Sequence, residues 1–317
     1  MRYSRVPSIL RMIVQEPGYR RYIKDTLFRP VNVEVSSNLP ERMAKPIAQL
    51  AMHVNNTPCE QLENPVSLFG FQIGYLVEQQ FRYLIREIFI EGCYFFHVEK
   101  PDPVILDCGS NIGLSIMFFK ALYPEACVIG FEPEPTTFTQ LAENVRANRL
   151  ANVELHNIAL SASDGDIDFF VPAEEVSSLF MSAYKERLSG ARITVPAKRL
   201  STFIPGRVDL LKMDVEGSEA GILGELEASG ALAHIDQMHL EYHHHITPAR
   251  DSMSEVLAIL ERNGFGYQIQ ARSPNWPTPA VFQDVALFAY RGMGGRDKRS
   301  SSTKERYNES VSVATSG

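Results

Sequence analysis

Several features that mark large classes of proteins are scarce in this sequence. Only four of its 317 residues are cysteine and none form C-x-x-C spacing, so we expect a reduced protein rather than a disulfide scaffold or zinc site. No apolar run approaches the roughly 18 residues of a membrane span, and the basic N-terminus lacks the pattern of a cleaved signal peptide. The net charge is −7, without the positive excess of general nucleic-acid binding. We expect a cytoplasmic protein with no transmembrane segment and no nucleic-acid partner; the oligomeric state is left open.

Composition is that of a globular chain, with 44% hydrophobic and 22% charged residues. Scattered prolines interrupt residues 1–70, which predicts a helical and irregular N-terminal extension. Residues 292–317 are rich in serine, lysine, arginine and glycine, which predicts a disordered tail. The segment between them, residues 71–291, is predicted to be the functional domain.

Strand-like and helix-like segments alternate in this domain, a pattern typical of an α/β fold with a parallel sheet and helices on both faces. Seven strands are predicted near residues 103–107, 127–132, 152–157, 208–213, 236–243, 265–271 and 282–290. Helices are predicted near residues 112–122, 135–148, 216–229 and 249–263, and an amphipathic helix over residues 71–91 is expected to cover the sheet. Two further runs, at 166–171 and 192–197, predict an inserted β-hairpin.

The stretch VILDCGSNIGLS combines a buried strand, an acid, a glycine turn and the start of a helix. Gly109 and Gly113 would let the backbone approach a ligand, whose anionic end would suit free N–H groups at the helix start. Asp107 adds an acceptor for an ammonium group. A ligand with both groups, such as the methionine part of S-adenosylmethionine, fits this turn better than a pyrophosphate does.

A second acid, Glu132, follows the strand CVIGF. At the end of a strand in an open α/β sheet, a carboxylate is well placed to accept both hydroxyls of a ribose. The segment HNIAL further on has no acid to bind an adenine amine, so backbone groups near Ala159 would have to serve.

Polar residues also follow two later strands, with Asp214 at one end and the run EYHHH at the other. Glu241 and His243 share one face of their strand, because side chains alternate in an extended chain. These three residues are the predicted catalytic group. His243 is the first choice for a general base, and Asp214 or Glu241 would orient it or take the role itself. The same three residue types could also bind a divalent metal, although no metal is predicted.

These segments resemble the FkbM family of S-adenosylmethionine-dependent methyltransferases. The resemblance covers roughly residues 83–290 and is carried by D-x-G-x-N-x-G at 107–113, F-E-P at 131–133 and K-M-D-V-E-G-S-E at 212–219. It implies a class I methyltransferase (Rossmann-like) fold and adds Asn111 to the cofactor-binding residues. It also implies O-methylation of a hydroxyl on a small metabolite, natural product or sugar.

Two other functions remain open at this point. One is a methyltransferase-like protein that binds S-adenosylmethionine without catalysis. The other is a nicotinamide-dependent oxidoreductase, which the absence of a G-x-G-x-x-G turn disfavours.

Overall fold

A computed structural model describes residues 62–68, 70–171, 191–204, 206–246, 252–271 and 283–291. The predictions for the disordered tail and for most of the N-terminal extension lie outside these residues. Within them, no helix has the length and apolar character needed to cross a membrane.

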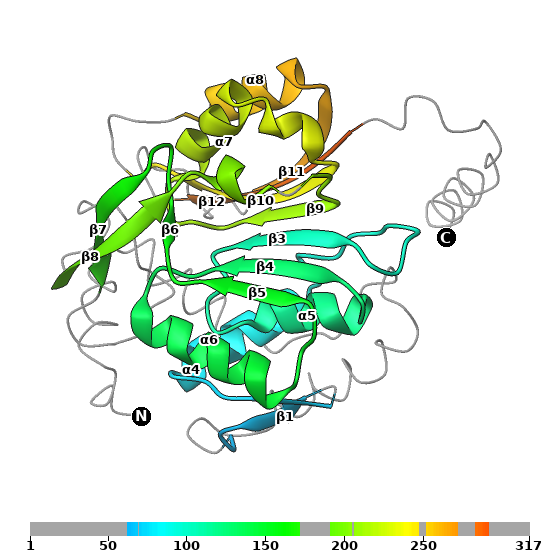
Figure 1. Ribbon diagram of the computed structural model, residues 1–317, viewed down its shortest axis with the longest axis vertical. Coiled ribbons are helices and arrows are strands. Elements are labelled where there is room, and N and C mark those ends of the chain that lie inside the picture. Colours follow the sequence, from blue (N-terminus) through cyan, green and yellow to red (C-terminus); the bar gives the residue numbers. More distant parts are fainter. Residues whose placement is uncertain are drawn as a thin grey trace, which may run out of the picture.

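A seven-stranded sheet forms the centre of the domain, in the order β11-β12-β10-β9-β3-β4-β5 (Figure 1). Its strands are β3 (Val104–Cys108), β4 (Cys127–Phe131), β5 (Val153–His156), β9 (Leu210–Met213), β10 (Gln237–His244), β11 (Phe265–Ala271) and β12 (Gln283–Arg291). β12 runs antiparallel to both of its neighbours, whereas β3, β4, β5, β9 and β10 pair in parallel. This is the predicted mostly parallel sheet of the class I methyltransferase fold.

The two faces of the sheet contribute to two different hydrophobic clusters. On β3, Ile105 packs into one cluster and Leu106 into the other, and Leu210 and Leu211 on β9 divide in the same way. This alternation is what two buried faces require, because successive side chains of a strand point in opposite directions.

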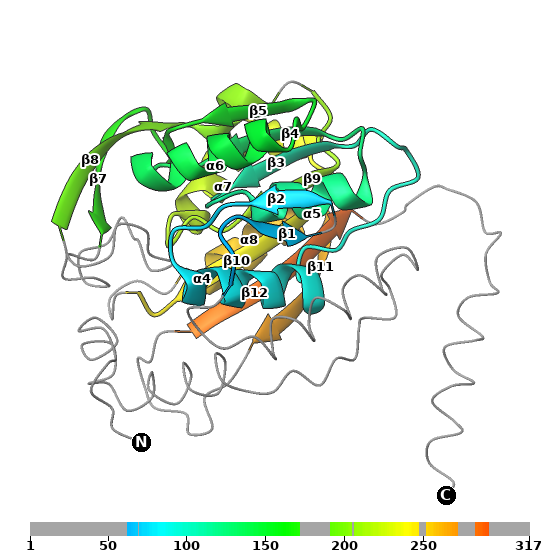
Figure 2. The ribbon, with the colours of Figure 1, turned by 90° about the horizontal axis from the view of Figure 1, so that it is seen from below.

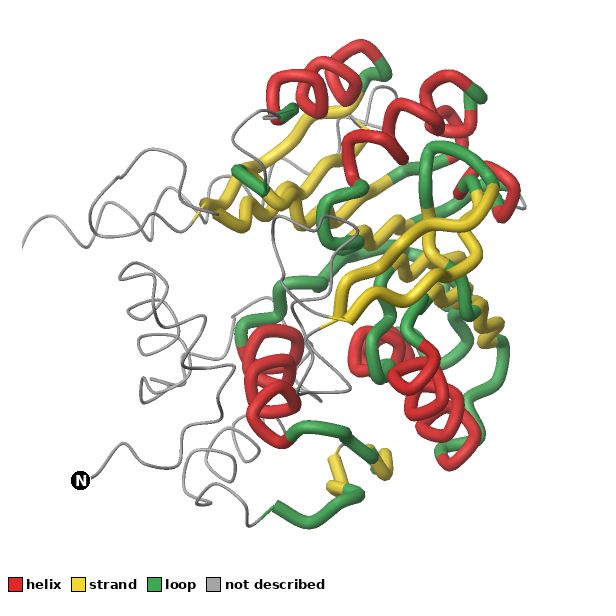
Figure 3. The backbone as a smooth tube through the Cα atoms, turned by 90° about the vertical axis from the view of Figure 1, so that its left-hand side faces the viewer, coloured by secondary structure: helices red, strands yellow, loops and turns green. Residues whose placement is uncertain are grey.

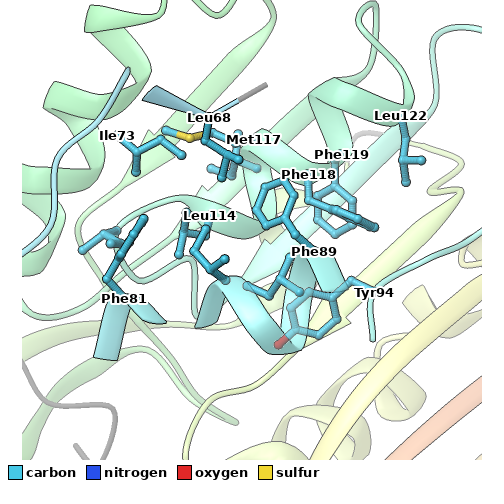
Figure 4. Packing of buried hydrophobic residues seen from close by; sticks show 14 of the residues in the cluster. Leu68, Ile73, Phe81, Phe89, Tyr94, Leu114, Met117, Phe118, Phe119 and Leu122 are labelled. Atoms are coloured by element: carbon cyan, nitrogen blue, oxygen red, sulfur yellow. The ribbon is translucent and has the colours of Figure 1, made fainter. Parts of the chain in front are cut away.

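Helices cover both faces, as predicted (Figures 2 and 3). The first cluster includes side chains of α5 (Leu114–Leu122) and α6 (Pro135–Ala147), and its aromatic centre is shown in Figure 4. The second includes side chains of α7 (Glu219–Ala228) and α8 (Met253–Arg262).

The predicted helix over residues 71–91 is wrong in its first part. Phe71–Ile73 form strand β2, which pairs antiparallel with β1 (Val66–Leu68). The covering helix begins only at α4 (Glu78–Leu84) and continues as a π-helix, η1 (Ile85–Ile90). Gly70, with φ of 83°, lies in the turn between the two strands, a conformation that glycine adopts without strain.

Asn144 of α6 and Asn148, the residue that ends this helix, hold the backbone of β2 and the residue after it. Asn144 accepts from the Gly74 N–H at 2.8 Å and donates to the Gly74 carbonyl at 2.9 Å. Asn148, one turn further along the chain, makes the same pair of hydrogen bonds with Gln72, at 2.7 and 2.8 Å. Asn144 also donates to the carbonyl of Ile112 at 2.8 Å, so this one buried amide joins α6 to the glycine turn.

The inserted hairpin is confirmed by β7 (Gly165–Val171) and β8 (Ala191–Lys198), which pair antiparallel. With the short strand β6 (Ala159–Leu160) they form a separate three-stranded sheet that stands out from the main one (Figure 1).

Candidate active site

One pocket lies at the carboxyl ends of the parallel strands, the position that open α/β sheets offer to ligands. It encloses about 810 Å³, including the solvent at its mouth. Leu84, Ile88 and Tyr94 form an apolar wall, and the predicted site supplies much of the rest of the lining. The predicted residues that line the pocket are Gly109, Asn111, Glu132, Ala159 and Asp214.

The glycine turn between β3 and α5 is held in an unusual backbone conformation. Gly109, Asn111 and Gly113 all have positive φ, at 84°, 48° and 93°. Most of its N–H groups are used within the protein. Gly109 and Ser110 donate to the carbonyl of Phe131, Asn111 to the carboxylate of Glu132, and Gly113 to the carbonyl of Ser110. The N–H group of Ile112 is also engaged, by the side chain of Asn111. The donors expected at the helix start would therefore be those of Leu114 and Ser115, which line the pocket.

Gly109 is required by the protein itself. A Cβ atom at this position would lie 1.9 Å from the carbonyl oxygen of Asp214, far inside any van der Waals contact. Sequence reasoning assigned this space to a ligand, but the end of β9 fills it. The close approach of β3 and β9 is what places Asp214 beside the turn.

Glu132 forms a rigid acceptor at the end of β4. Its two carboxylate oxygens accept the N–H groups of Asn111 at 3.0 Å and Glu134 at 2.9 Å, and the residue is only 4% exposed. Burial raises the pKa of Glu132 to about 7, although the two backbone hydrogen bonds work in the opposite direction. Each oxygen keeps a further lone pair, so the carboxylate can still accept two hydroxyl groups from the pocket.

Asp107 lies beneath the turn and is fully buried, outside the pocket lining. Ser115 donates to one of its oxygens at 2.6 Å, and Lys212 Nζ lies 3.5 Å from the other. Lys212 also donates to the carbonyl of Gly109 at 2.5 Å. Burial works to lower the pKa of Lys212, but the nearby carboxylates of Asp107 and Asp214 outweigh it and raise that pKa to about 12. The Asp107–Lys212 pair therefore fixes the turn from below.

Asp214, Glu241 and His243, hereafter the acid–histidine cluster, are brought together as predicted, with one ligand-type atom of each within 4.8 Å of the others. Met213 and Leu240 are register partners on β9 and β10, so the residues that follow them lie side by side. Such a spacing would also allow the three side chains to hold one divalent cation. Burial raises the pKa of Glu241 well above its usual value, and the charge of Asp214 adds to this effect.

The members of this cluster differ in their access to the pocket. Asp214 lines it, with 26% of its side chain exposed, whereas the side chain of His243 is 2% exposed and lies behind. His243 Nε2 is 3.7 Å from Asp214 Oδ1 and 3.2 Å from Glu216 Oε2. A substrate in the pocket would therefore meet Asp214 before His243.

The helix predicted near residues 216–229 would place both Glu216 and Glu219 in its first turn, where the helix dipole favours acidic side chains. The structure instead puts the Glu219 carboxylate 2.8 Å from His243 Nδ1. Glu216, with φ of 59°, precedes the helix, which begins only at Glu219. The motif K-M-D-V-E-G-S-E contains both acids, and it was the feature of the sequence that could have indicated them as site residues.

Comparison with known proteins gives the family. Residues 107–267, just over half of the chain, match the model of the methyltransferase FkbM domain. The chain belongs to the FkbM methyltransferase family. The methyltransferase sdnD of Sordaria araneosa is 34% identical over 205 residues, which cover 54% of this chain and 77% of that protein. The 31-O-demethyl-FK506 methyltransferase FkbM of Streptomyces tacrolimicus is 29% identical over 228 residues, which cover 62% of this chain and 86% of that protein.

Among solved structures, the methyltransferase FkbM from Methylobacillus flagellatus KT aligns with a TM-score of 0.42 and 15% identity. The alignment covers 78% of this chain and 60% of that one. In this FkbM-family chain, the matched residues 107–267 include every predicted site residue, from Asp107 to His243.

Proposed function

We propose that this protein transfers the methyl group of S-adenosylmethionine to a hydroxyl oxygen of a small metabolite, natural product or sugar. The observation that carries the proposal is one pocket lined by the glycine turn, by Glu132 and by Asp214. The name of the Streptomyces relative, which specifies an O-methylated position, supports oxygen as the acceptor atom.

For the donor, the buried Glu132 carboxylate fits a ribose, because its two oxygens are oriented by backbone N–H groups and retain accepting capacity. Ile158 and Ala159 line the part of the pocket proposed for the adenine, where backbone groups would bind its amine. Asp107 and Gly113 would act from behind the pocket, by holding the turn. When bound, S-adenosylmethionine supplies an electrophilic methyl group.

For the acceptor, the acid–histidine cluster is proposed to take up the hydroxyl proton. Asp214 is the member that touches the acceptor, since it lines the pocket. His243 lies behind it with Nε2 3.7 Å away and would receive the proton from Asp214, which returns Asp214 to its carboxylate form. Glu241 lies beside Asp214 and would help to orient it. Holding the acceptor in line with the methyl group is the other task of the pocket.

The test combines calorimetry with product analysis. S-adenosylmethionine should bind to the wild-type protein, and an isotope-labelled methyl group should appear on oxygen in a metabolite extract analysed by mass spectrometry. Donor binding with no labelled product would support the alternative of a binding protein without catalysis and contradict the proposed transfer. Failure to bind S-adenosylmethionine would contradict the proposal that it is the methyl donor. Label on nitrogen or carbon would contradict the proposal that the acceptor is a hydroxyl oxygen.

A further inference from the structure

Glu219 and His243 form a contact between a helix and the sheet that is almost completely withdrawn from solvent. Their side chains are 1% and 2% exposed, and Glu219 Oε1 lies 2.8 Å from His243 Nδ1. Glu219 is the first residue of α7, and His243 is on β10. A buried carboxylate is costly unless it is paired, so this contact needs an explanation beyond the preference of acids for helix starts.

The proton in this contact belongs on Nδ1. Burial acts to raise the pKa of Glu219, but its interaction with His243, together with the N–H of Gly217, lowers that pKa overall. The carboxylate is therefore an acceptor at neutral pH, and Nδ1 must be the donor. The same oxygen also accepts the N–H of Gly217 at 2.9 Å, which fixes the direction of the carboxylate.

With Nδ1 held in this way, the opposite ring nitrogen faces the site. His243 Nε2 lies 3.2 Å from Glu216 Oε2, 3.7 Å from Asp214 Oδ1 and 4.0 Å from Asp284 Oδ1. Of these three acids, Asp214 and Glu216 line the pocket. A continuous series of side chains thus connects the interior of the protein with the pocket, from Glu219 through His243 to Asp214 and Glu216. Which nitrogen of a neutral histidine carries the hydrogen is set by the hydrogen bond that the other one makes.

We propose that Glu219 is a positioning residue for methyl transfer. By accepting the Nδ1 hydrogen it fixes the orientation and tautomer of His243, so that Nε2 can receive the proton that Asp214 takes from the acceptor. The inference rests on the proposed function, because the proton transfer belongs to that reaction.

The first test is spectroscopic and needs no substrate. A two-bond ¹H–¹⁵N correlation spectrum of the full chain with labelled histidine should show His243 protonated on Nδ1 alone at neutral pH. Glu219→Leu should abolish the preference for this tautomer. Glu219→Gln should keep it, because the Gly217 N–H holds the amide oxygen in place. His243 protonated on Nε2, or on both nitrogens, in the wild type would overturn the proposal.

The second test is a double-mutant cycle on the single-turnover rate. Glu219→Leu should slow transfer by about 10- to 100-fold, part of the about 10²–10⁴-fold that a positioned base contributes, while donor affinity is unchanged. Glu219→Gln should restore much of the rate, and it also tests the proposal if Glu219→Leu does not fold.

In the His243→Ala background, Glu219→Leu should cost nothing further, because the two residues act as a unit. An equal loss in both backgrounds, or a wild-type rate in Glu219→Leu, would overturn the positioning role. If the wild-type protein transfers no methyl group at all, the proposed function fails, whereas the spectrum still decides where the proton lies.

Discussion

The two halves of the pocket are built in different ways. Around β3 and β4 the site is mostly backbone, a turn with three residues at positive φ and one carboxylate held by N–H groups. Around β9 and β10 it is made of side chains that converge from separate elements, with Asp214 in front, His243 behind and Glu219 on α7. A substitution in the first half should therefore disturb folding or donor binding. One in the second half should disturb the chemical step.

The largest effect is expected in the second half. His243→Ala and Asp214→Asn should each lower the single-turnover rate by about 10²–10⁴-fold, because the hydroxyl proton loses its path, while donor affinity measured by calorimetry stays nearly unchanged. Near wild-type rates in both variants would leave positioning alone as the mechanism. Loss of wild-type activity on adding a chelator would instead show that the acid–histidine cluster holds a metal ion.

In the first half, Gly109→Ala should lower the free energy of unfolding by about 2–5 kcal/mol, since the new Cβ meets the Asp214 carbonyl and φ is positive. Gly224→Ala, in α7 with no heavy atom within 4 Å of the added Cβ, is the matched control. It should gain up to about 1 kcal/mol from helix propensity. Chemical denaturation measures both, and equal stability of the two variants would show that β9 can move away from the turn.

Glu132 should make stability depend on pH. Its pKa is raised from 4.5 to about 7 in the folded protein, so the folded state binds this proton more tightly than the unfolded state does. Stability is therefore lost as the pH rises through this interval, by on the order of 3 kcal/mol. Between pH 5 and 8, unfolding of Glu132→Gln should show a correspondingly weaker decline than the wild type. If the stability of the two proteins changed with pH in parallel, the pKa of Glu132 would not be raised by folding, and its side chain would be in contact with solvent.

The smallest effect concerns donor affinity. Glu132→Ala removes the proposed ribose acceptors and should weaken S-adenosylmethionine binding by about 1–3 kcal/mol. Glu154→Ala on the neighbouring strand β5 is the control, since its side chain is 65% exposed and outside the pocket lining. Unchanged affinity in Glu132→Ala would remove Glu132 from the donor site.

Sequence was sufficient for the parts of the site that depend on local patterns. Strand ends followed by acids predicted the positions of Glu132 and Asp214, because parallel strands present their carboxyl ends at one edge. The sequence was insufficient where a segment far away along the chain determines what surrounds a residue. The space beside Gly109 is taken by β9, about a hundred residues later, and Asp107 faces Lys212 rather than the pocket. Likewise, the motif K-M-D-V-E-G-S-E contains Glu219, but it does not show that this side chain points inward to His243.

The hydrogen bonds from α6 to β2 also bear on how the molecule behaves in a concentrated solution. A two-stranded sheet has open edges, and an open edge is a template on which a strand of another molecule can pair. Asn144 and Asn148 occupy the N–H and C=O groups of Gly74 and Gln72 along one edge of β2. Their separation of four residues, about 6 Å along a helix, approaches the almost 7 Å between alternate residues of a strand. A helix thus takes the place of a third strand, and this edge is closed to aggregation.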